Sequence, residues 1–524
     1  MDNLIKQTYW PEFQKHVLAL SRVHLGTILN KRNKSYKLRL GGIEYDFSNN
    51  HFTTKTIGFF KKYTHNCNIS AFIDKLFSAW HLNNSEDSPV LHMALRANDE
   101  GTFFLNGDDL HPLIKANKDC IKKIADDIRS DKFRCASGKK VKNIVHLGTG
   151  GSELGPRMLI KALSHLKKTH INIKFLSNLD PCELEDITNT FCPSETVVII
   201  ASKSFSTYET LTNAKQILSW LGDDAVSQQC FAITANALSA TKLGISSQHI
   251  LPLWSWVGGR FSIWSAISLV VAIAIGYENF NAFIKGGQLV DQHIKHSSTI
   301  DNIPLLMALF DILYTNLMSI PTRAIIPYSA GLEYFVDYIQ QVMMESNGKS
   351  HSYCGKLINY QTSPIIWGGV GTNSQHSFHQ LLMQGTHQIA IDLIYFKQTT
   401  SSFKQQHQLL VEQCLAQSKA LAYGSNDVNN QSIYYVKGNQ PQNVLAIESA
   451  TPYNIGTLIA LYEYRSMFYG ALLNINSFDQ HGVELGKKLV ARKFSKKLIA
   501  RSSSFNKTIK LKDNQPLNKL KLYK

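Results

Sequence analysis

The feature that most constrains this chain is a rhythm of short apolar runs, each followed by a stretch of helical length, that starts near residue 140. Four such runs lie in the first half of the chain, at 143–147, 173–176, 196–201 and 231–234. Four more follow residue 320, at 324–327, 364–367, 388–394 and 444–447. Short apolar strands that alternate with helices build parallel sheets with helices on both faces. We therefore predict an α/β fold with two doubly wound α/β/α sandwich domains.

The length of 524 residues suits two or three domains of ordinary size. The strand rhythm places the first α/β domain at 116–285 and the second at 286–490. A mixed segment, 1–115, precedes them and contains a strand-like run at 36–40. A basic tail, 491–524, follows them. Ligands of open parallel sheets bind beyond the carboxyl ends of the strands, so the loops that leave the strands are the places to look for chemistry.

The positive charge is concentrated at the C-terminus. The formal net charge is +16, and from Lys487 onward thirteen Lys and Arg stand against one acid, Asp513. This end of the chain therefore carries +12 of the total, and the rest is close to balanced. The pattern favours a solvated basic tail over a nucleic-acid contact or an anionic-membrane contact.

Cysteines and apolar stretches bear on the compartment. The eight cysteines include no C-x-x-C pair, so we expect reduced thiols in the cytoplasm rather than disulfides or a zinc cluster. The N-terminus has no basic region followed by an apolar core, so we expect no secretory signal. The most apolar stretch, 261–276, contains three serines and follows Arg260. It is short for a membrane span and predicts a buried helix.

Two of the loops have the chemistry of anion sites. Residues 148–156 read Gly-Thr-Gly-Gly-Ser-Glu-Leu-Gly-Pro after a strand, and such glycines let backbone amides approach a ligand. A tight structural turn explains this loop equally well. Residues 202–207 hold four hydroxyls and Lys203 before a predicted helix. This set suits a phosphate, although a helix cap rich in Ser and Thr is the alternative.

Two further loops place single charged residues at chain turns. Arg260 follows a glycine pair and is either a cation for a developing oxyanion or an ordinary surface residue. Glu345 precedes Asn347-Gly348, which predicts the end of a helix. The helix dipole disfavours a charged carboxylate there, so this carboxyl suits proton transfer. An exposed glutamate without a role is the alternative.

The last two segments contain histidines and polar groups. His376, His379 and His387 could suggest a metal, but no acid or cysteine completes a ligand set nearby. Proton transfer by a histidine at the start of a helix is the favoured interpretation. The segment 477–488 places Gln480 and Lys487 around a helix start, which says little on its own.

Together these six segments, in this order between about 144 and 490, resemble the phosphoglucose isomerase family of glycolysis and gluconeogenesis. The resemblance implies two sugar-isomerase (SIS) domains, a homodimer with active sites at the subunit boundary, and no metal or redox cofactor. It implies an aldose–ketose exchange between glucose 6-phosphate and fructose 6-phosphate through ring opening and an enediolate.

The resemblance also implies a role for each matching residue. Glu345 would carry the proton between C2 and C1, and Arg260 would stabilise the enediolate. His376, supplied by the other subunit, would assist ring opening, and Lys487 would contact substrate oxygens. The remaining expected substrate-binding residues are Gly151, Ser152, Ser202, Lys203, Ser204, Thr207, Gln341 and Gln480.

The sequence departs from the family pattern at a few positions. Ser204 and Ser206 stand where threonine is commoner, Thr149 where an aliphatic residue is usual, and Glu153 where aspartate is common. His481 stands where an aromatic residue is frequent, which puts the packing beside Gln480 in doubt. None of these changes removes a catalytic group. Two alternatives stay open: a phosphosugar isomerase that also accepts mannose 6-phosphate, and a non-catalytic sugar-phosphate sensor.

Overall fold

The computed structural model describes residues 9–32, 35–97, 103–167, 170–425 and 432–490. The chain divides into a large unit, Met1–Asp479, and a small one, Gln480–Lys524. The predicted basic tail, 491–524, lies outside the described residues.

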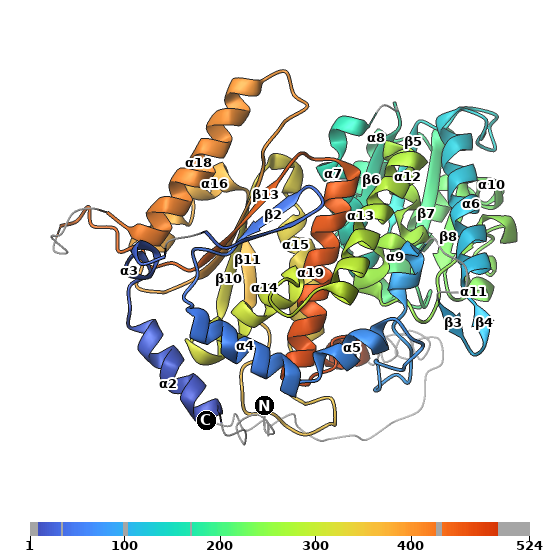
Figure 1. The fold of residues 1–524 in the computed structure, drawn as a ribbon. Coiled ribbons are helices and arrows are strands. Elements are labelled where there is room, and N and C mark those ends of the chain that lie inside the picture. Colours follow the sequence, from blue (N-terminus) through green and yellow to red (C-terminus); the bar gives the residue numbers. More distant parts are fainter. Residues whose placement is uncertain (1–8, 33–34, 98–102, 168–169, 426–431, 491–524) are drawn as a thin grey trace, which may run out of the picture. The chain divides into compact units, whose positions relative to one another are not determined.

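The first sheet is wholly parallel. Its five strands lie in the order β6-β5-β7-β8-β9. They are β5 (Asn143–Leu147), β6 (Asn172–Leu176), β7 (Thr196–Ala201), β8 (Cys230–Thr234) and β9 (Ile250–Pro252). The helices around it are α6 (His111–Arg129), α7 (Leu154–Ala162), α8 (Pro181–Thr190), α9 (Tyr208–Leu221), α10 (Asp223–Gln229), α11 (Ala237–Thr241) and α12 (Leu269–Ile275) (Figure 1).

Both faces of this sheet are buried, as the apolar runs predict. In β7, Val197 and Ile199 join the core that contains residues of α6, α7 and α12. Val198 and Ile200 point to the other face and join a core with residues of α8 and α9. Side chains alternate between the two faces of a strand, so a strand that is apolar throughout requires helices on both sides. The doubly wound prediction is confirmed for this sheet.

The second sheet is mixed. Its order is β1-β2-β13-β12-β10-β11, with β10 to β13 parallel and β2 antiparallel to β13. The strands are β1 (Lys37–Leu40), β2 (Ile43–Asp46), β10 (Thr322–Tyr328), β11 (Ile365–Gly368), β12 (Ala390–Phe396) and β13 (Gln442–Ile447). The four predicted parallel strands are therefore present. The addition of the β1–β2 hairpin to their edge was not predicted, because strand pairing across 400 residues leaves no local signal.

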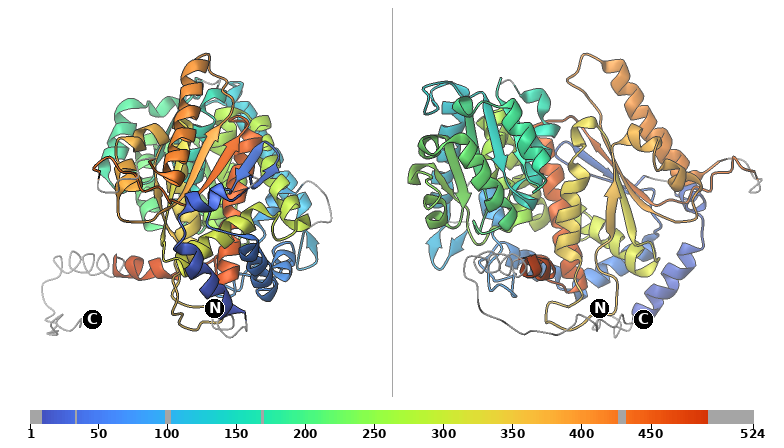
Figure 2. Two further views of the ribbon diagram at one scale, coloured as in Figure 1. Left: turned by 60° about the vertical axis from the view of Figure 1, so that its left-hand side comes forward. Right: turned by 180° about the vertical axis from the view of Figure 1, so that it is seen from behind.

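The helices of this half include one buried almost all round. They are α14 (Ile303–Ile312), α15 (Phe335–Gln340), α16 (Gly371–Gln375), α17 (His379–Gln384), α18 (Lys404–Tyr423) and α19 (Pro452–Leu473). α19 packs on α13 (Tyr277–His296), with Gly286 and Gly456 at the contact. A Cβ on Gly456 would lie 2.0 Å from the Phe283 carbonyl oxygen, so glycine is required for this close approach. α18 projects from the second sheet (Figure 2).

The described parts of the N-terminal region contain helices, short strands and turns. It contains α2 (Trp10–Ser21), α3 (Leu25–Asn30), α4 (Thr54–Asn66), α5 (Ile69–Leu76) and the two-stranded β3 (Phe104–Leu105) and β4 (Asp108–Asp109).

The apolar stretch 261–276 is buried as predicted, but the expectation of a single helix is wrong. Two 3-10 segments, Gly259–Trp264 and Ala266–Ser268, precede α12. The Ser262 hydroxyl donates to the Gly259 carbonyl at 2.6 Å, and the Ser265 hydroxyl donates to the Ser262 carbonyl at 2.7 Å. Such side-chain bonds compete with the backbone pattern of an α-helix. In the part of the chain that is described, no helix has the length and apolarity to cross a membrane.

Candidate active site

Three of the predicted loops meet at two glycines. A Cβ on Gly151 would lie 2.1 Å from the Gly259 carbonyl oxygen and 2.7 Å from the Arg260 backbone nitrogen. Gly150 has a φ of +57°, and a Cβ there would lie 2.8 Å from the Gln341 side-chain nitrogen. The glycines thus serve the packing of one loop on another. They bring the segments of Ser152, Arg260 and Gln341 together.

A buried histidine hydrogen-bonds to the loop at 148–156. The buried ring of His146 lies with Nε2 2.8 Å from the Ser152 carbonyl oxygen. Burial lowers the His146 pKa to about 4, so the ring is neutral and donates through Nε2. The next residue, Glu153, forms an ion pair with Arg157, and burial raises its pKa to about 7. Ser152 itself stays half-buried.

Lys203 links the loop at 202–207 to the segment that precedes Arg260. Its ammonium donates to the carbonyl oxygens of Ser255 at 2.8 Å and Val257 at 2.9 Å. Burial lowers the pKa of Lys203. These carbonyls lie just before the glycine pair that precedes Arg260, so one lysine sets the distance between two predicted binding loops.

The hydroxyls of the second loop stand at the start of α9. Ser202 is buried, whereas Ser204 and Ser206 are exposed and their hydroxyl oxygens are 2.8 Å apart. Thr207 is the residue before the helix, and its side chain makes no capping bond to the helix. Phe205, between Ser204 and Ser206, is buried and has a φ of +51°, so its side chain packs inward where its two neighbours are exposed. The hydroxyl of Thr207 therefore does not serve as an ordinary helix cap.

Arg260 is almost completely buried and is held mainly by neutral acceptors. Its Nε donates to the Ser346 hydroxyl at 2.6 Å. Its Nη2 donates to the carbonyl oxygens of Ser477 at 2.6 Å and Asp479 at 3.1 Å. Nη1 lies 3.5 Å from Oε2 of Glu345. Burial lowers the Arg260 pKa, yet a guanidinium keeps its charge in proteins. That charge is directed at Glu345.

Glu345 ends a π-helical turn, Gln341–Glu345, that continues α15. The helix stops at Asn347 as predicted, but the π-turn was not predicted. Such turns are rare and concentrate at functional sites. The Glu345 side chain is 26% exposed, against 2% for Arg260. The carboxylate therefore lies between a buried cation and the solvent.

α19 supports this turn from behind. The Ser466 hydroxyl donates to the Val342 carbonyl at 2.7 Å. The Asn347 side chain in turn donates to the Ser466 carbonyl oxygen at 3.0 Å and to its hydroxyl at 2.9 Å. The first bond satisfies a backbone carbonyl of the π-turn, and the other two join the end of the helix to α19. The position of Glu345 thus depends on a helix more than 100 residues away in the sequence.

His376 and His379 differ in exposure and in their contacts. His376 follows α16 and is exposed, and its backbone amide bonds the Asn373 carbonyl at 3.1 Å. His379 is buried, and its ring bonds the Ser374 hydroxyl at 3.1 Å and Gln417 at 3.3 Å. Those contacts give His379 a packing role. Among the residues described, no group of three or more His, Cys, Asp or Glu is placed to hold a metal ion.

Gln480 and Lys487 fall in the small unit. Lys487 lies 2.7 Å from the carboxylate of Glu484, and its side chain is 56% exposed. The backbone carbonyl of Gln480 accepts from the Val483 amide. The membership of Gln480 and Lys487 in the site is a prediction from the family resemblance.

Lys349, Ser346, Ser477 and Asp479 are residues of the site to which the sequence assigned no role. Two of them contact Arg260 through a backbone carbonyl, and Ser346 does so through its hydroxyl. Backbone acceptors carry no residue-type signal, so a motif cannot reveal them. The adjacency of Ser346 to Glu345 and of Asp479 to Gln480 was the available hint.

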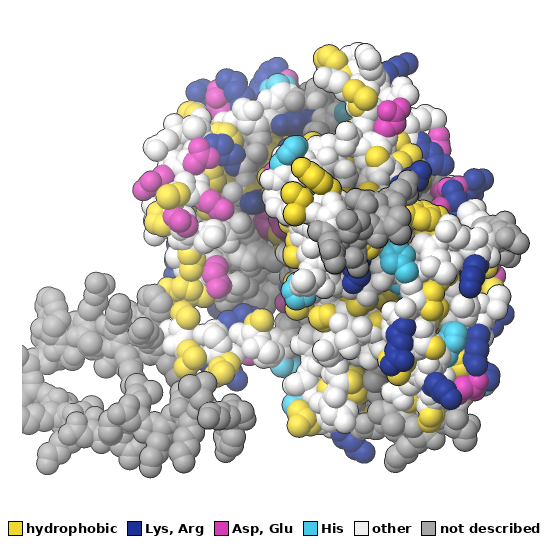
Figure 3. All heavy atoms as spheres, turned by 90° about the vertical axis from the view of Figure 1, so that its left-hand side faces the viewer, with side chains coloured by type: hydrophobic (Ala, Val, Ile, Leu, Met, Phe, Trp, Pro, Cys, Tyr) yellow, Lys and Arg dark blue, Asp and Glu magenta, His cyan; other side chains and the backbone are white. Residues whose placement is uncertain are grey.

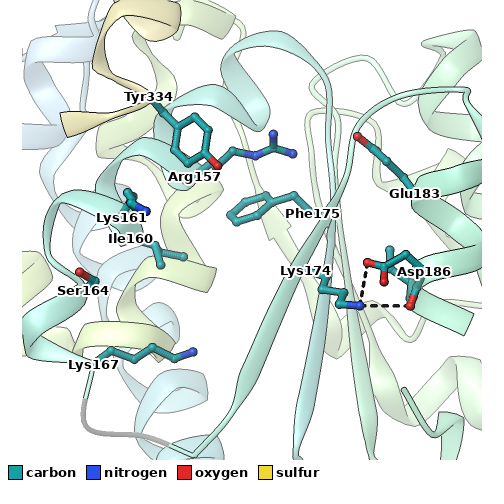
Figure 4. A pocket seen from close by; sticks show the side chains of 11 residues that line it. Arg157, Ile160, Lys161, Ser164, Lys167, Lys174, Phe175, Glu183, Asp186 and Tyr334 are labelled. Atoms are coloured by element: carbon teal, nitrogen blue, oxygen red, sulfur yellow. Dashed lines mark hydrogen bonds and ion pairs between the residues drawn. The ribbon is translucent and has the colours of Figure 1, made fainter. Parts of the chain in front are cut away.

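A pocket of about 430 Å³ lies elsewhere, between α7, β6 and α8 (Figure 4). None of the predicted site residues lines it. Its cations include Lys174, which is 2.7 Å from Asp186, and Lys161, which is 3.0 Å from Glu333. Paired cations attract an anion weakly. Because none of the predicted site residues lines this pocket, we place the candidate site at the meeting point of the loops, where Arg260 faces Glu345.

Comparisons with known proteins agree on one family. The family model described as phosphoglucose isomerase matches residues 46–510. The glucose-6-phosphate isomerase of Saccharophagus degradans is 37% identical and covers 92% of this chain and 91% of its own length. That of Wigglesworthia glossinidia brevipalpis is 36% identical over 100% of this chain and 99% of its own. The crystal structure of a Chlamydia trachomatis glucose-6-phosphate isomerase matches with a TM-score of 0.83 and 29% identity, covering 94% and 96% of the two chains.

Proposed function

The chain belongs to the phosphoglucose isomerase family, and from this membership we infer that it interconverts D-glucose 6-phosphate and D-fructose 6-phosphate. The observation that carries the assignment to particular residues is the contact between Arg260 and Glu345 at 3.5 Å. One group can remove a proton and the other can stabilise the resulting negative charge. We also propose a role for each of the residues around this contact.

Aldose–ketose exchange needs a base for the carbon-bound proton and a cation for the developing oxyanion. We propose that Glu345 takes the proton from C2 of the open-chain aldose and returns it to C1. Between these steps the negative charge is shared by the enediolate oxygens, and the hydroxyl proton moves from O2 to O1, which leaves the ketose carbonyl at C2. Arg260 stabilises that charge from a buried, pre-oriented position, where water does not screen it.

The phosphate group is proposed to bind at the second loop. Ser202, Lys203, Ser204 and Thr207 supply hydroxyls and one positive charge before α9. The positive end of a 14-residue helix adds to the attraction of a dianion. Ser152 and Gly151 lie on the neighbouring loop, which packs on the Arg260 segment. The phosphate would thus anchor the substrate while Gln341 and Gln480 line the sugar.

We propose a cytoplasmic homodimer in which His376 of one subunit assists ring opening in the other. His376 is exposed, as such a shared residue requires. The side of the molecule with α18 presents hydrophobic side chains to solvent (Figure 3). Phe403, Ile433 and Tyr434 are 68%, 81% and 79% exposed, which supports burial of this surface by a partner.

The proposed cytoplasmic location is supported by the thiols. None of the eight cysteines, all in described parts of the chain, forms a disulfide.

The variant Glu345→Gln tests the assignment of the base. Turnover of glucose 6-phosphate should fall by about three orders of magnitude or more, while KM changes little, because only proton transfer is lost. Steady-state kinetics in both directions measures this. The matched control is Glu333→Gln, which alters an exposed glutamate paired with Lys161 and should keep normal turnover. Near-normal turnover in Glu345→Gln would refute the assignment.

A further inference from the structure

Beside Arg260 lies a largely buried ion pair that the proposed reaction does not use. The Lys349 ammonium donates to Oδ1 of Asp479 at 2.8 Å and to the Asp479 backbone carbonyl oxygen at 2.6 Å. The two side chains are 16% and 10% exposed. One lysine therefore holds both the side chain and the backbone of Asp479. Lys349 lies four residues after Glu345, at the end of the same segment.

The Asp479 carboxylate is also held from a second direction. Its Oδ2 accepts from the Ser85 hydroxyl at 2.5 Å and from the Asn476 side-chain amide at 2.9 Å. Asn476 in turn donates to the side chain of Asn83 at 3.0 Å. A buried carboxylate needs several donors and a cation to keep its charge. The pair thus belongs to a network that joins three distant parts of the chain.

The Asp479 carbonyl oxygen serves Arg260 as well. Nη2 of Arg260 lies 3.1 Å from this oxygen and 2.6 Å from the Ser477 carbonyl oxygen. Two cations therefore converge on one carbonyl, and their repulsion needs a negative charge nearby. The Asp479 carboxylate supplies it through its ion pair with Lys349. Arg260 can then bond to neutral carbonyls and keep its charge for Glu345 and the substrate.

We propose that Lys349 and Asp479 form a clamp that positions Arg260 for stabilisation of the enediolate. The clamp fixes the Asp479 carbonyl oxygen, which together with the Ser477 carbonyl oxygen orients the guanidinium. Both clamp residues act through Arg260 and are positioning residues. This inference rests on the proposed isomerase function. It implies that loss of the clamp harms binding of the charged intermediate more than binding of the substrate.

Kinetics of Lys349→Met and Asp479→Asn tests the clamp. In each variant kcat should fall by about tenfold to a hundredfold, because a small displacement of Arg260 weakens transition-state binding. KM should change by less than about threefold. Lys349→Arg keeps the charge and the reach to Asp479, so it should recover most of kcat. The matched control is Lys161→Met, which breaks the exposed pair with Glu333 and should leave kcat unchanged.

Inhibitor binding separates positioning from a merely structural role. A pentonate 5-phosphate carries a carboxylate in place of the enediolate, whereas sorbitol 6-phosphate is an uncharged open-chain analogue at that end. The clamp variants should lose affinity for the pentonate by about the factor lost in kcat and bind sorbitol 6-phosphate normally. Equal losses for both inhibitors would overturn the proposal.

Two further results keep the tests independent. In the double variant Lys349→Met/Asp479→Asn, the loss in kcat should be close to that of one single variant, because the two residues act as a unit. Multiplied losses would overturn the clamp, as would unchanged kcat in both single variants. Failure of the wild-type protein to isomerise glucose 6-phosphate would instead contradict the proposed function.

Discussion

At the scale of single residues, the notable point is that Arg260 donates hydrogen bonds to neutral acceptors, while its ion pair is with Glu345. Three of its N–H donors go to the Ser346 hydroxyl and to two backbone carbonyls, and Glu345 is the carboxylate that its Nη1 approaches. Neutral acceptors fix the direction of the guanidinium but leave its positive potential intact. A cation held in this way stabilises a new oxyanion at little cost in reorganisation.

This arrangement predicts that charge alone does not suffice at position 260. Arg260→Lys should lower kcat by about a hundredfold or more, because an ammonium lacks the planar fork that bonds three acceptors at once. KM for glucose 6-phosphate should change far less. Arg39→Lys is the matched control, since Arg39 is 76% exposed and pairs with Glu44, and its kcat should be normal. A kcat within threefold of wild type in Arg260→Lys would contradict the prediction.

At the scale of elements, the site depends on contacts that involve segments of irregular backbone. The loop at Gly150–Ser152 touches the segment Gly259–Trp264, and the π-turn Gln341–Glu345 rests on α19. Regular helices and strands hold these pieces but do not contain them. Small changes of volume at such contacts are felt directly, because close-packed neighbours cannot yield without moving backbone.

Gly151→Ala tests this dependence. The new methyl group would lie 2.1 Å from the Gly259 carbonyl oxygen, so one loop must move away from the other. We expect a loss of roughly 1–3 kcal/mol in unfolding free energy together with a clear fall in kcat, measured by urea denaturation and kinetics.

The control for this substitution is Gly58→Ala. Gly58 lies within α4, and a Cβ there meets no atom within 4 Å. Alanine should raise stability by about 0.5–1 kcal/mol there, because glycine is the poorer helix former. Equal effects of the two substitutions would count against a special role for the loop contact.

At the scale of the whole molecule, α19 places charged side chains in the protein interior. Arg465 and Arg323 share Asp311 and Asp392 in one cluster in which every side chain is at most 1% exposed. A second cluster joins Arg96, Asp291 and Glu463. The Glu463 carboxylate also accepts from the indole N–H of Trp264 at 2.9 Å and from the hydroxyl of Tyr338 at 3.1 Å. Trp264 lies on the segment that contains Arg260, and Tyr338 lies on α15, which precedes the turn that ends at Glu345.

The second cluster makes stability depend on pH. Burial raises the Glu463 pKa to about 7, above the value of about 4.3 for an exposed glutamate. A raised carboxyl pKa means that the folded state holds its proton more tightly. The proton on Glu463 therefore stabilises the folded state. This stabilisation is fully present below about pH 4.3 and is lost as pH rises through 7.

Glu463→Gln removes this titration. The difference in unfolding free energy between variant and wild type should shift in favour of the variant by a few kcal/mol, as an order of magnitude, from pH 5 to pH 8. Urea denaturation at several pH values measures it. The exposed-site variant Glu333→Gln should show no comparable trend. A difference that stays constant from pH 5 to pH 8 would show that Glu463 does not titrate in this range.

The sequence predicted the strands well because strands that are buried on both faces consist of nearly continuous apolar residues. β5 and β7 have the predicted bounds, and the other predicted strands differ by a few residues. The stretch 261–276 was predicted less well, since its serines bond to nearby carbonyls and break the helix, an effect that periodicity does not register. The domain bounds, the dimer and the roles of all the proposed site residues, Glu345 and Arg260 included, remain predictions.

The sequence by itself determined which side chains and loops are present: strands apolar on both faces, glycines and hydroxyls after them, and the residue types that isomerisation requires. These are local properties, set by composition and spacing along the chain. Only the tertiary structure decided that Arg260 faces Glu345, that α19 supports the π-turn, and that Lys349 and Asp479 lie beside them. Such contacts join residues 80 to more than 200 positions apart, and many run through backbone carbonyls, which every residue has and no motif can mark.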